Sequence, residues 1–143
     1  MNVTIYKFGF YTGLFAFVST VAFNIVQLLQ VVGALSFPLD EVLIYITSLC
    51  IVIPFVLEIL ALHYAASEEK KIYSHAALIF SIIYAVFVTS NYVVQLATVI
   101  PMQLQGTLHE VQVLKQTPHS FFWDFDAIGY MYGFCNFICY TCL

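Results

Sequence analysis

A long apolar run between residues 42 and 66 constrains this chain more than any other feature. The run is long enough to cross a bilayer, which takes about 20 apolar residues in a helix. Glu58 nevertheless lies well inside it. A carboxylate near the centre of a membrane helix costs about 2.5–3.5 kcal/mol on insertion scales. The rest of the chain must therefore surround this side chain with polar groups, which predicts a helical bundle with a polar interior.

The composition supports a membrane protein. Of the 143 residues, 62% are hydrophobic and only 8% are charged, whereas a soluble domain carries about 25% charged residues. We therefore predict one all-α membrane domain over 1–143, with the lipid bilayer as its main partner. The four basic residues are all lysines, which is too small a cationic surface for nucleic-acid phosphates or for a polybasic lipid-headgroup site.

Apolar segments divide this domain into a transmembrane helical bundle with three full spans, followed by a fourth span. The predicted full spans are 8–32, 42–66 and 76–100. Pro101 is expected to end the third helix, because proline lacks a backbone donor. A polar extracytoplasmic loop follows at 101–121, and its amphipathic spacing predicts a short helix on the membrane surface.

The fourth span, 122–143, is expected to be truncated. Its apolar part begins at Ala127 and lasts about 17 residues, the lower limit for crossing a bilayer. No cytoplasmic flank follows it, and its last residues are rich in cysteine. We expect a truncated or frameshifted ending, with a native fourth helix that continues further.

The lysines predict the orientation. Lys7, Lys70 and Lys71 would lie on one side of the membrane and Lys115 on the other. Basic residues favour the cytoplasmic side. The N-terminus and the 67–75 loop are therefore expected in the cytoplasm, in a multi-pass protein of the inner (plasma) membrane.

Two G-x-x-x-G motifs predict close contacts between helices, because glycine lets two backbones approach. The motifs are Gly9/Gly13 in the first span and Gly129/Gly133 in the fourth. Each could serve packing within the chain or association between copies.

Polar side chains form inward stripes on the spans and define the candidate ligand-binding residues. Glu58 lies in the inner third of its helix, where we expect it to meet Ser81 or Tyr84. The other polar residues form a layer nearer the outer surface. They could join the helices or line a small hydrated cavity for a small polar or amphipathic ligand. The full candidate set is Asn24, Gln27, Glu58, Tyr84, Asn91, Tyr92, Gln95, Asp124 and Asp126.

Recognised catalytic and metal-binding motifs do not occur in the sequence. Cys135, Cys139 and Cys142 share a helix face but lack a fourth ligand. No Ser-His-Asp order, phosphate loop or dinucleotide fingerprint is present. We predict no metal, no cofactor and no assigned catalytic residue.

Three segments resemble an uncharacterised family of small prokaryotic multi-pass membrane proteins. They are LHYAASEEKK, SNYVVQLATVIPMQL and TPHSFFWDFDAIGYMY. The resemblance covers about residues 60–132 and implies no activity. In such proteins an apolar helix continues after the segment matching Gly129-Tyr130, and further spans follow. This chain departs from that pattern at about Gly133.

Three functions fit these patterns. The first is a small-ligand binding or transport-associated bundle that uses the outer polar layer. The second is a structural or accessory membrane subunit, in which polar groups only set the helix register. The third is a membrane-embedded enzyme that uses Glu58 and Tyr84 as an acid/base pair. The sequence favours the first two over an enzyme, because no second carboxylate accompanies Glu58.

The predicted topology can be tested with single cysteines introduced at Ser67 and Gln112. A membrane-impermeant thiol reagent should label them from opposite sides of the membrane, because the 67–75 loop is expected inside and the 101–121 loop outside. Labelling of both from the same side would overturn the predicted topology.

Overall fold

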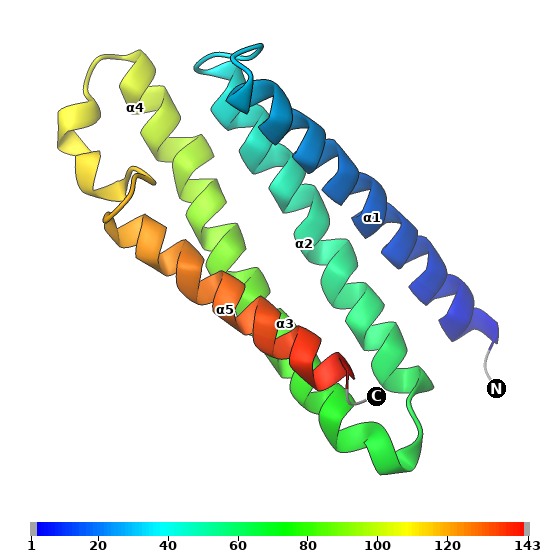
Figure 1. Ribbon diagram of the computed structural model, residues 1–143. Helices are drawn as coiled ribbons and strands as arrows, with labels where there is room; N and C mark the ends of the chain where they lie inside the picture. Colours follow the sequence, from blue (N-terminus) through cyan, green and yellow to red (C-terminus); the bar gives the residue numbers. More distant parts are fainter. Residues whose placement is uncertain (1–2, 142–143) are drawn as a thin grey trace.

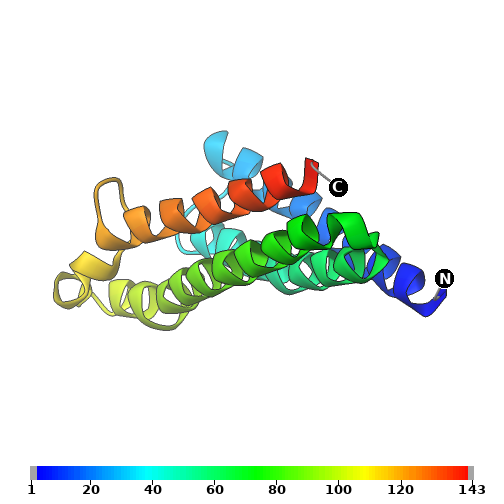
Figure 2. The ribbon, with the colours of Figure 1, turned by 90° about the horizontal axis from the view of Figure 1, so that it is seen from below.

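The computed structural model describes residues 3–141, and in this range the chain forms helices and no strand. The main helices are α1 (Val3–Val31), α2 (Leu39–Ala65), α3 (Lys71–Val94) and α5 (Phe121–Thr141). They run in alternating directions, so the N-terminus, the α2–α3 turn and the end of α5 lie at one end (Figures 1 and 2). We call the opposite end, which holds the α1–α2 turn and the long loop, the outer end. The prediction of an all-α bundle is confirmed.

Three helices are long and apolar enough to cross a membrane. They cover Val3–Val31, Leu39–Ala65 and Glu68–Leu104. The third stretch has 37 residues and is about 55 Å long at about 1.5 Å per residue. This length exceeds the hydrocarbon thickness of a bilayer, which is about 30 Å.

The four main helices pack as two hairpins. Helix α1 packs on α2, α5 packs on α3, and α2 packs on α3 between them. Figure 1 shows α2 between α1 and α3. No extensive contact joins α1 to α5 among the described residues. The bundle is therefore open along the side where these two helices face each other.

Both glycine motifs lie in contacts within the chain. A Cβ atom added to Gly9 would lie 2.9 Å from Ala61 Cβ, and one added to Gly13 would lie 2.9 Å from Glu58 Oε1. Gly129 and Gly133 of α5 are similarly close to α3, the latter with its added Cβ 3.3 Å from the Tyr84 ring. The motifs thus bring α1 onto α2 and α5 onto α3.

Pro101 does not end the third helix, contrary to prediction. A π-helical turn over Gln95–Val99 precedes α4 (Ile100–Leu104), and the Ile100 N–H donates to the Gln95 carbonyl five residues back. This wider turn changes the hydrogen-bond spacing just before the proline, which has no N–H to donate. The helix therefore continues through Pro101.

The long loop also differs from the prediction. Residues 105–120 contain two single 3-10 turns, Leu108–Glu110 and Gln112–Leu114, in place of a helix on the membrane surface. The sequence spacing of the loop's apolar residues is therefore not evidence of a helix here. The loop is held by side chains of the α3 segment, as described below.

Gly9 and Gly13 should respond differently to alanine, although both lie in the α1–α2 contact. We expect Gly9→Ala to lower the free energy of unfolding by about 1–3 kcal/mol, because the Ala61 Cβ cannot rotate away. Gly13→Ala should be close to neutral, since the Glu58 carboxyl is the mobile end of a long side chain and alanine favours helix by about 1 kcal/mol. Unfolding in mixed micelles with increasing dodecyl sulfate measures both. Equal losses would contradict this contact geometry.

Candidate functional site

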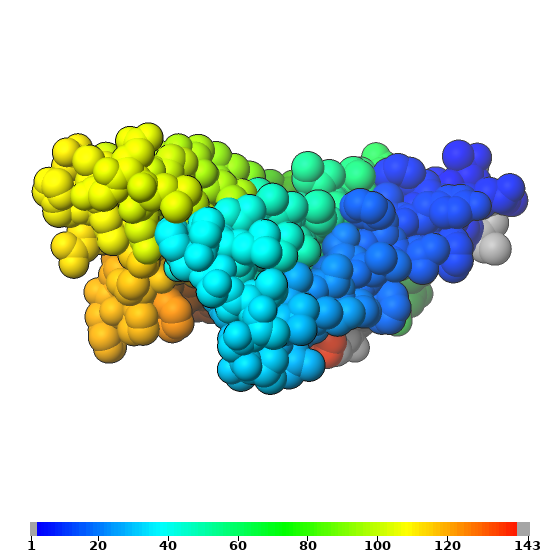
Figure 3. Space-filling view, turned by 90° about the horizontal axis from the view of Figure 1, so that it is seen from above, coloured from blue at the N-terminus to red at the C-terminus, as the bar shows by residue number. Residues whose placement is uncertain are grey.

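The open side of the bundle contains a polar cavity near the outer end. We call it the outer cavity. Its volume is about 610 Å³, and α1, α2, α3, α5 and the long loop all contribute to its walls. Figure 3 looks onto this end and shows a recess between the cyan α1–α2 turn and the orange start of α5. The lining residues are Phe23, Gln27, Gln30, Glu41, Ile44, Tyr45, Tyr92, Gln116, Trp123, Asp126 and Tyr130.

A second cavity continues from the first toward the middle of the bundle. This inner cavity has a volume of about 470 Å³ and shares Phe23 and Tyr130 with the outer one. We call the two together the groove. Apolar and aromatic side chains dominate the inner part, where a few polar groups lie among them. The lining residues are Thr20, Phe23, Asn24, Ser48, Ile51, Phe55, Tyr84, Tyr130, Gly133 and Phe134.

Asp126 is the most enclosed charged group of the outer cavity. Only 9% of this residue is exposed. Gln116 Nε2 donates to its Oδ2 over 2.9 Å, and the side chains of Asn91 and Tyr92 approach the same carboxyl. Asp126 Oδ1 and Asn91 Nδ2 are buried without a hydrogen-bond partner in the described part of the chain. Unpaired buried polar groups of this kind are rare and mark a site to explain.

Gln95 positions the loop that supplies Gln116. Gln95 is only 1% exposed. Its side-chain amide bonds to the loop backbone as a neighbouring strand would: Nε2 donates to the Leu114 carbonyl over 2.7 Å, and Oε1 accepts the Gln116 N–H over 3.2 Å. Lys115, between them, donates from Nζ to Gln103 Oε1 over 3.0 Å. These bonds bring Gln116 to Asp126 and fix this wall of the cavity.

The facing walls come from α1 and α2. Gln30 Nε2 donates to Asp40 Oδ2 over 3.0 Å and so ties the two helices together at the outer end. Glu41, one residue further, is half-buried and lines the outer cavity. The rings of Tyr45 and Tyr92 pack with centroids 5.2 Å apart, which joins α2 to α3 beneath the cavity.

Most of the predicted site residues gather at the groove, although from different positions. Those lining it are Asn24, Gln27, Tyr84, Tyr92 and Asp126. Asn91 and Gln95 lie behind its wall, where Asn91 is fully buried and Gln95 holds the loop. Asp124 is exposed and does not line the groove.

Glu58 does not meet Ser81 or Tyr84, which corrects the prediction. Its carboxyl lies against Gly13 of α1, beside a separate cavity of about 260 Å³ between α1 and α2. Tyr84 instead packs edge-on against Phe55, with ring centroids 5.7 Å apart. The helical period places Glu58 on a polar stripe, but it cannot tell which neighbouring helix that stripe faces. The Glu58–Tyr84 pair of the enzyme hypothesis is therefore absent from the described structure.

Several groove residues were not in the predicted set. Gln116 belongs to a loop that the sequence does not place, and Tyr130 lies on α5. The hydroxyls of Tyr130 and Tyr92 are 3.1 Å apart, so these rings share a hydrogen bond across α3 and α5. Glu41 is an acidic residue in the first turn of α2. No signal in the sequence alone distinguishes these groups from ordinary loop and helix residues.

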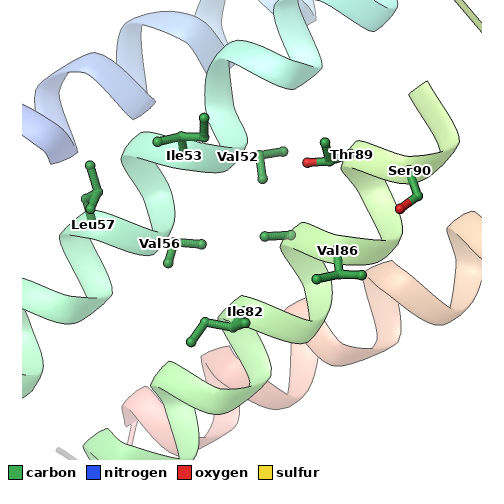
Figure 4. A pocket seen from close by; sticks show the side chains of 9 residues that line it. Val52, Ile53, Val56, Leu57, Ile82, Val86, Thr89 and Ser90 are labelled. Atoms are coloured by element: carbon green, nitrogen blue, oxygen red, sulfur yellow. The ribbon is translucent and has the colours of Figure 1, made fainter. Parts of the chain in front are cut away.

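A second open groove lies between α2 and α3 and is almost entirely apolar. Its volume is about 500 Å³. Figure 4 shows Val52 and Val56 of α2 on one side and Ile82 and Val86 of α3 on the other. No charged group lines it, so it offers nothing that would orient a polar ligand. Its chemistry suits contact with lipid chains.

No group of three His, Cys, Asp or Glu side chains that could hold a metal ion occurs in 3–141. Cys135 and Cys139 are free thiols, while Cys142 lies outside the described residues. No protein-family model, curated protein or solved structure matches this chain.

The Gln95 contacts predict a specific change in protease sensitivity. Lys115 is the only tryptic site between Lys71 and the end of the chain. Gln95→Leu removes both bonds to the loop and should increase the rate of trypsin cleavage after Lys115 by about tenfold, because each buried bond lost costs about 1–3 kcal/mol. Mass spectrometry of timed digests measures the rate.

The exposed loop residue Gln105 supplies the matched control. Gln105→Leu should leave the cleavage rate unchanged. An unchanged rate in Gln95→Leu would contradict the role given to this side chain.

Proposed function

We propose that this chain is a multi-pass integral membrane protein that binds a small polar or amphipathic ligand in the groove between α1 and α5, in a transport-associated role. One observation carries the proposal: polar side chains from four helices and a loop converge on one open cavity. Ligand sites in helical bundles lie between helices and combine apolar walls with a few placed polar groups.

The alternative is that these polar groups only join helices, as in a structural or accessory subunit. Asn136 supports that role at the other end of α5, where its buried Nδ2 donates to the Ala77 carbonyl of α3 over 2.9 Å. The outer cavity differs from this contact. Gln27 is exposed, Glu41 is only half-buried, and both line this cavity. Contacts between helices therefore do not enclose these two side chains. This difference favours the ligand-binding function.

The proposal includes the orientation and the relationship of the chain. We place the N-terminus and the 67–75 loop in the cytoplasm of a plasma membrane, from the distribution of lysines. The groove then opens near the extracytoplasmic surface. We also propose kinship with the small prokaryotic multi-pass membrane proteins that residues 60–132 resemble.

Water access to the groove tests the proposed function. Asn24 and Ile25 are adjacent in α1 and both exposed, but only Asn24 lines the groove. In a background without native cysteines, Asn24→Cys should react with a water-soluble maleimide in the bilayer, whereas Ile25→Cys should not. A thiol facing hydrocarbon cannot form the reactive thiolate.

A second pair nearer the outer end extends this test. Gln27 lines the outer cavity, and its neighbour Leu28 is exposed on another side of α1. Gln27→Cys should react faster than Leu28→Cys. Equal rates within both pairs would show that the groove is not hydrated and would contradict a ligand site there.

A further inference from the structure

We propose that the ligand is an amphipathic cation, a protonated or quaternary amine with an apolar tail, whose charged head lies in the outer cavity. This inference rests on the proposed function and names the chemical class of the ligand. Three features of the groove carry it: the charge of the outer cavity, its aromatic walls, and the apolar cavity beneath it.

Acidic side chains line the outer cavity, and no basic side chain does. Its walls carry two carboxyl groups, Asp126 of α5 and Glu41 of α2, and no basic side chain lines either cavity. Lys115 of the loop acts electrostatically on Glu41, but it does not line the cavity, and its Nζ donates to Gln103 Oε1. An anionic head would meet like charges here, whereas a cationic head has two partners of opposite sign.

Asp126 gives separate support for a cationic ligand, because its carboxyl is buried and is not simply solvated at the surface. It is nine-tenths buried, and Oδ1 has no hydrogen-bond partner in the described chain. The bond from Gln116 to Oδ2 satisfies only part of its capacity to accept hydrogen bonds. A cation that enters the cavity would complete the surroundings of this carboxyl.

Aromatic rings line the same cavity. Tyr45, Tyr92, Trp123 and Tyr130 all contribute to its walls. Tyr92 is held on both sides, by the Tyr45 ring and by the Tyr130 hydroxyl. Ring faces attract cations within about 6 Å, and cages of aromatic rings are the usual way to bind quaternary ammonium groups. Carboxylates and rings together therefore favour an amine over a metal ion, which would need more oxygen ligands.

The inner cavity fits the tail. Tyr84 lines the inner cavity and Tyr92 the outer one; they are eight residues apart on α3, or about 12 Å along the helix axis. Phe55 and Phe134 make the deeper part largely apolar. Because α1 and α5 do not close over the groove, an amphiphile can enter sideways from the membrane. A ligand with a cationic head and an apolar tail would place its head in the acidic outer cavity and its tail in the apolar inner cavity.

The chain contains its own reporter for a test. Trp123 is the only tryptophan and lines the outer cavity. The full chain in a nonionic detergent would be titrated with hexyltrimethylammonium, hexanol and hexanoate while tryptophan fluorescence is recorded. Hexyltrimethylammonium should give a saturable change, hexanol should bind at least about tenfold more weakly, and hexanoate should not bind, since each factor of ten is a modest electrostatic difference.

Three variants identify the groups responsible. Asp126→Asn and Glu41→Gln should each weaken binding of hexyltrimethylammonium by about tenfold, the usual effect of losing one charge-assisted contact. Asp124→Asn is the matched control, because Asp124 is an exposed acid on the same helix that does not line the groove. Its affinity should equal that of the unchanged chain. If Asp126→Asn does not fold, Glu41→Gln alone decides.

The outcomes separate this inference from the proposed function. Equal binding of all three probes, no binding of the cation, or an equal loss in Asp124→Asn would overturn the cationic ligand. The proposed function would still stand if Asn24→Cys reacts with the water-soluble maleimide. Equal maleimide rates within both cysteine pairs, at Asn24 and Ile25 and at Gln27 and Leu28, would remove the proposed function itself.

Discussion

In hydrocarbon a polar side chain has no water to bind, so it must find its partner inside the protein. This constraint organises the α3–α5 pair from end to end. The Tyr92 and Tyr130 hydroxyls join α3 to α5 nearer the outer end, and Asn136 binds the α3 backbone toward the other end. Gly129 and Gly133 allow the two helices to approach closely. Polar contacts thus fix the register, and small residues fix the distance.

Helix α1 is attached differently, and this difference creates the groove. It packs on α2 alone, and among its described residues only Ala16 and Ser19 are buried. The tie between Gln30 and Asp40 holds its outer end. Helix α5 packs on α3 and makes no extensive contact with α1 within residues 3–141. Asn24 and Gln27 therefore face an open cavity, where in a closed bundle they would join two helices.

Joining helices and lining a cavity are consequently roles of different residues within one polar layer. Asn91 and Gln95 are fully enclosed, and Gln95 sets the position of the loop, whose Gln116 binds Asp126. Gln27 and Glu41 remain accessible from the groove. The enclosed amides act through the groups that they position, while the accessible groups define the charge and polarity that a ligand would meet. A rigid inner shell behind a few accessible groups is the usual construction of a binding site.

The sequence by itself determined the class of this protein: segment length and hydropathy require long helices, and a chain with 8% charged residues cannot cover its surface with polar groups. It also identified the polar layer, because a period of 3.6 residues places Asn91 and Gln95 on one face. Only the tertiary structure decided which helix each face meets. Glu58 faces Gly13 and not Tyr84. The helical period shows which side of α2 carries Glu58, but it does not show which helix packs against that side. The long loop likewise depends on the bonds that Gln95 makes to it from about twenty residues away along the chain, which no local pattern contains.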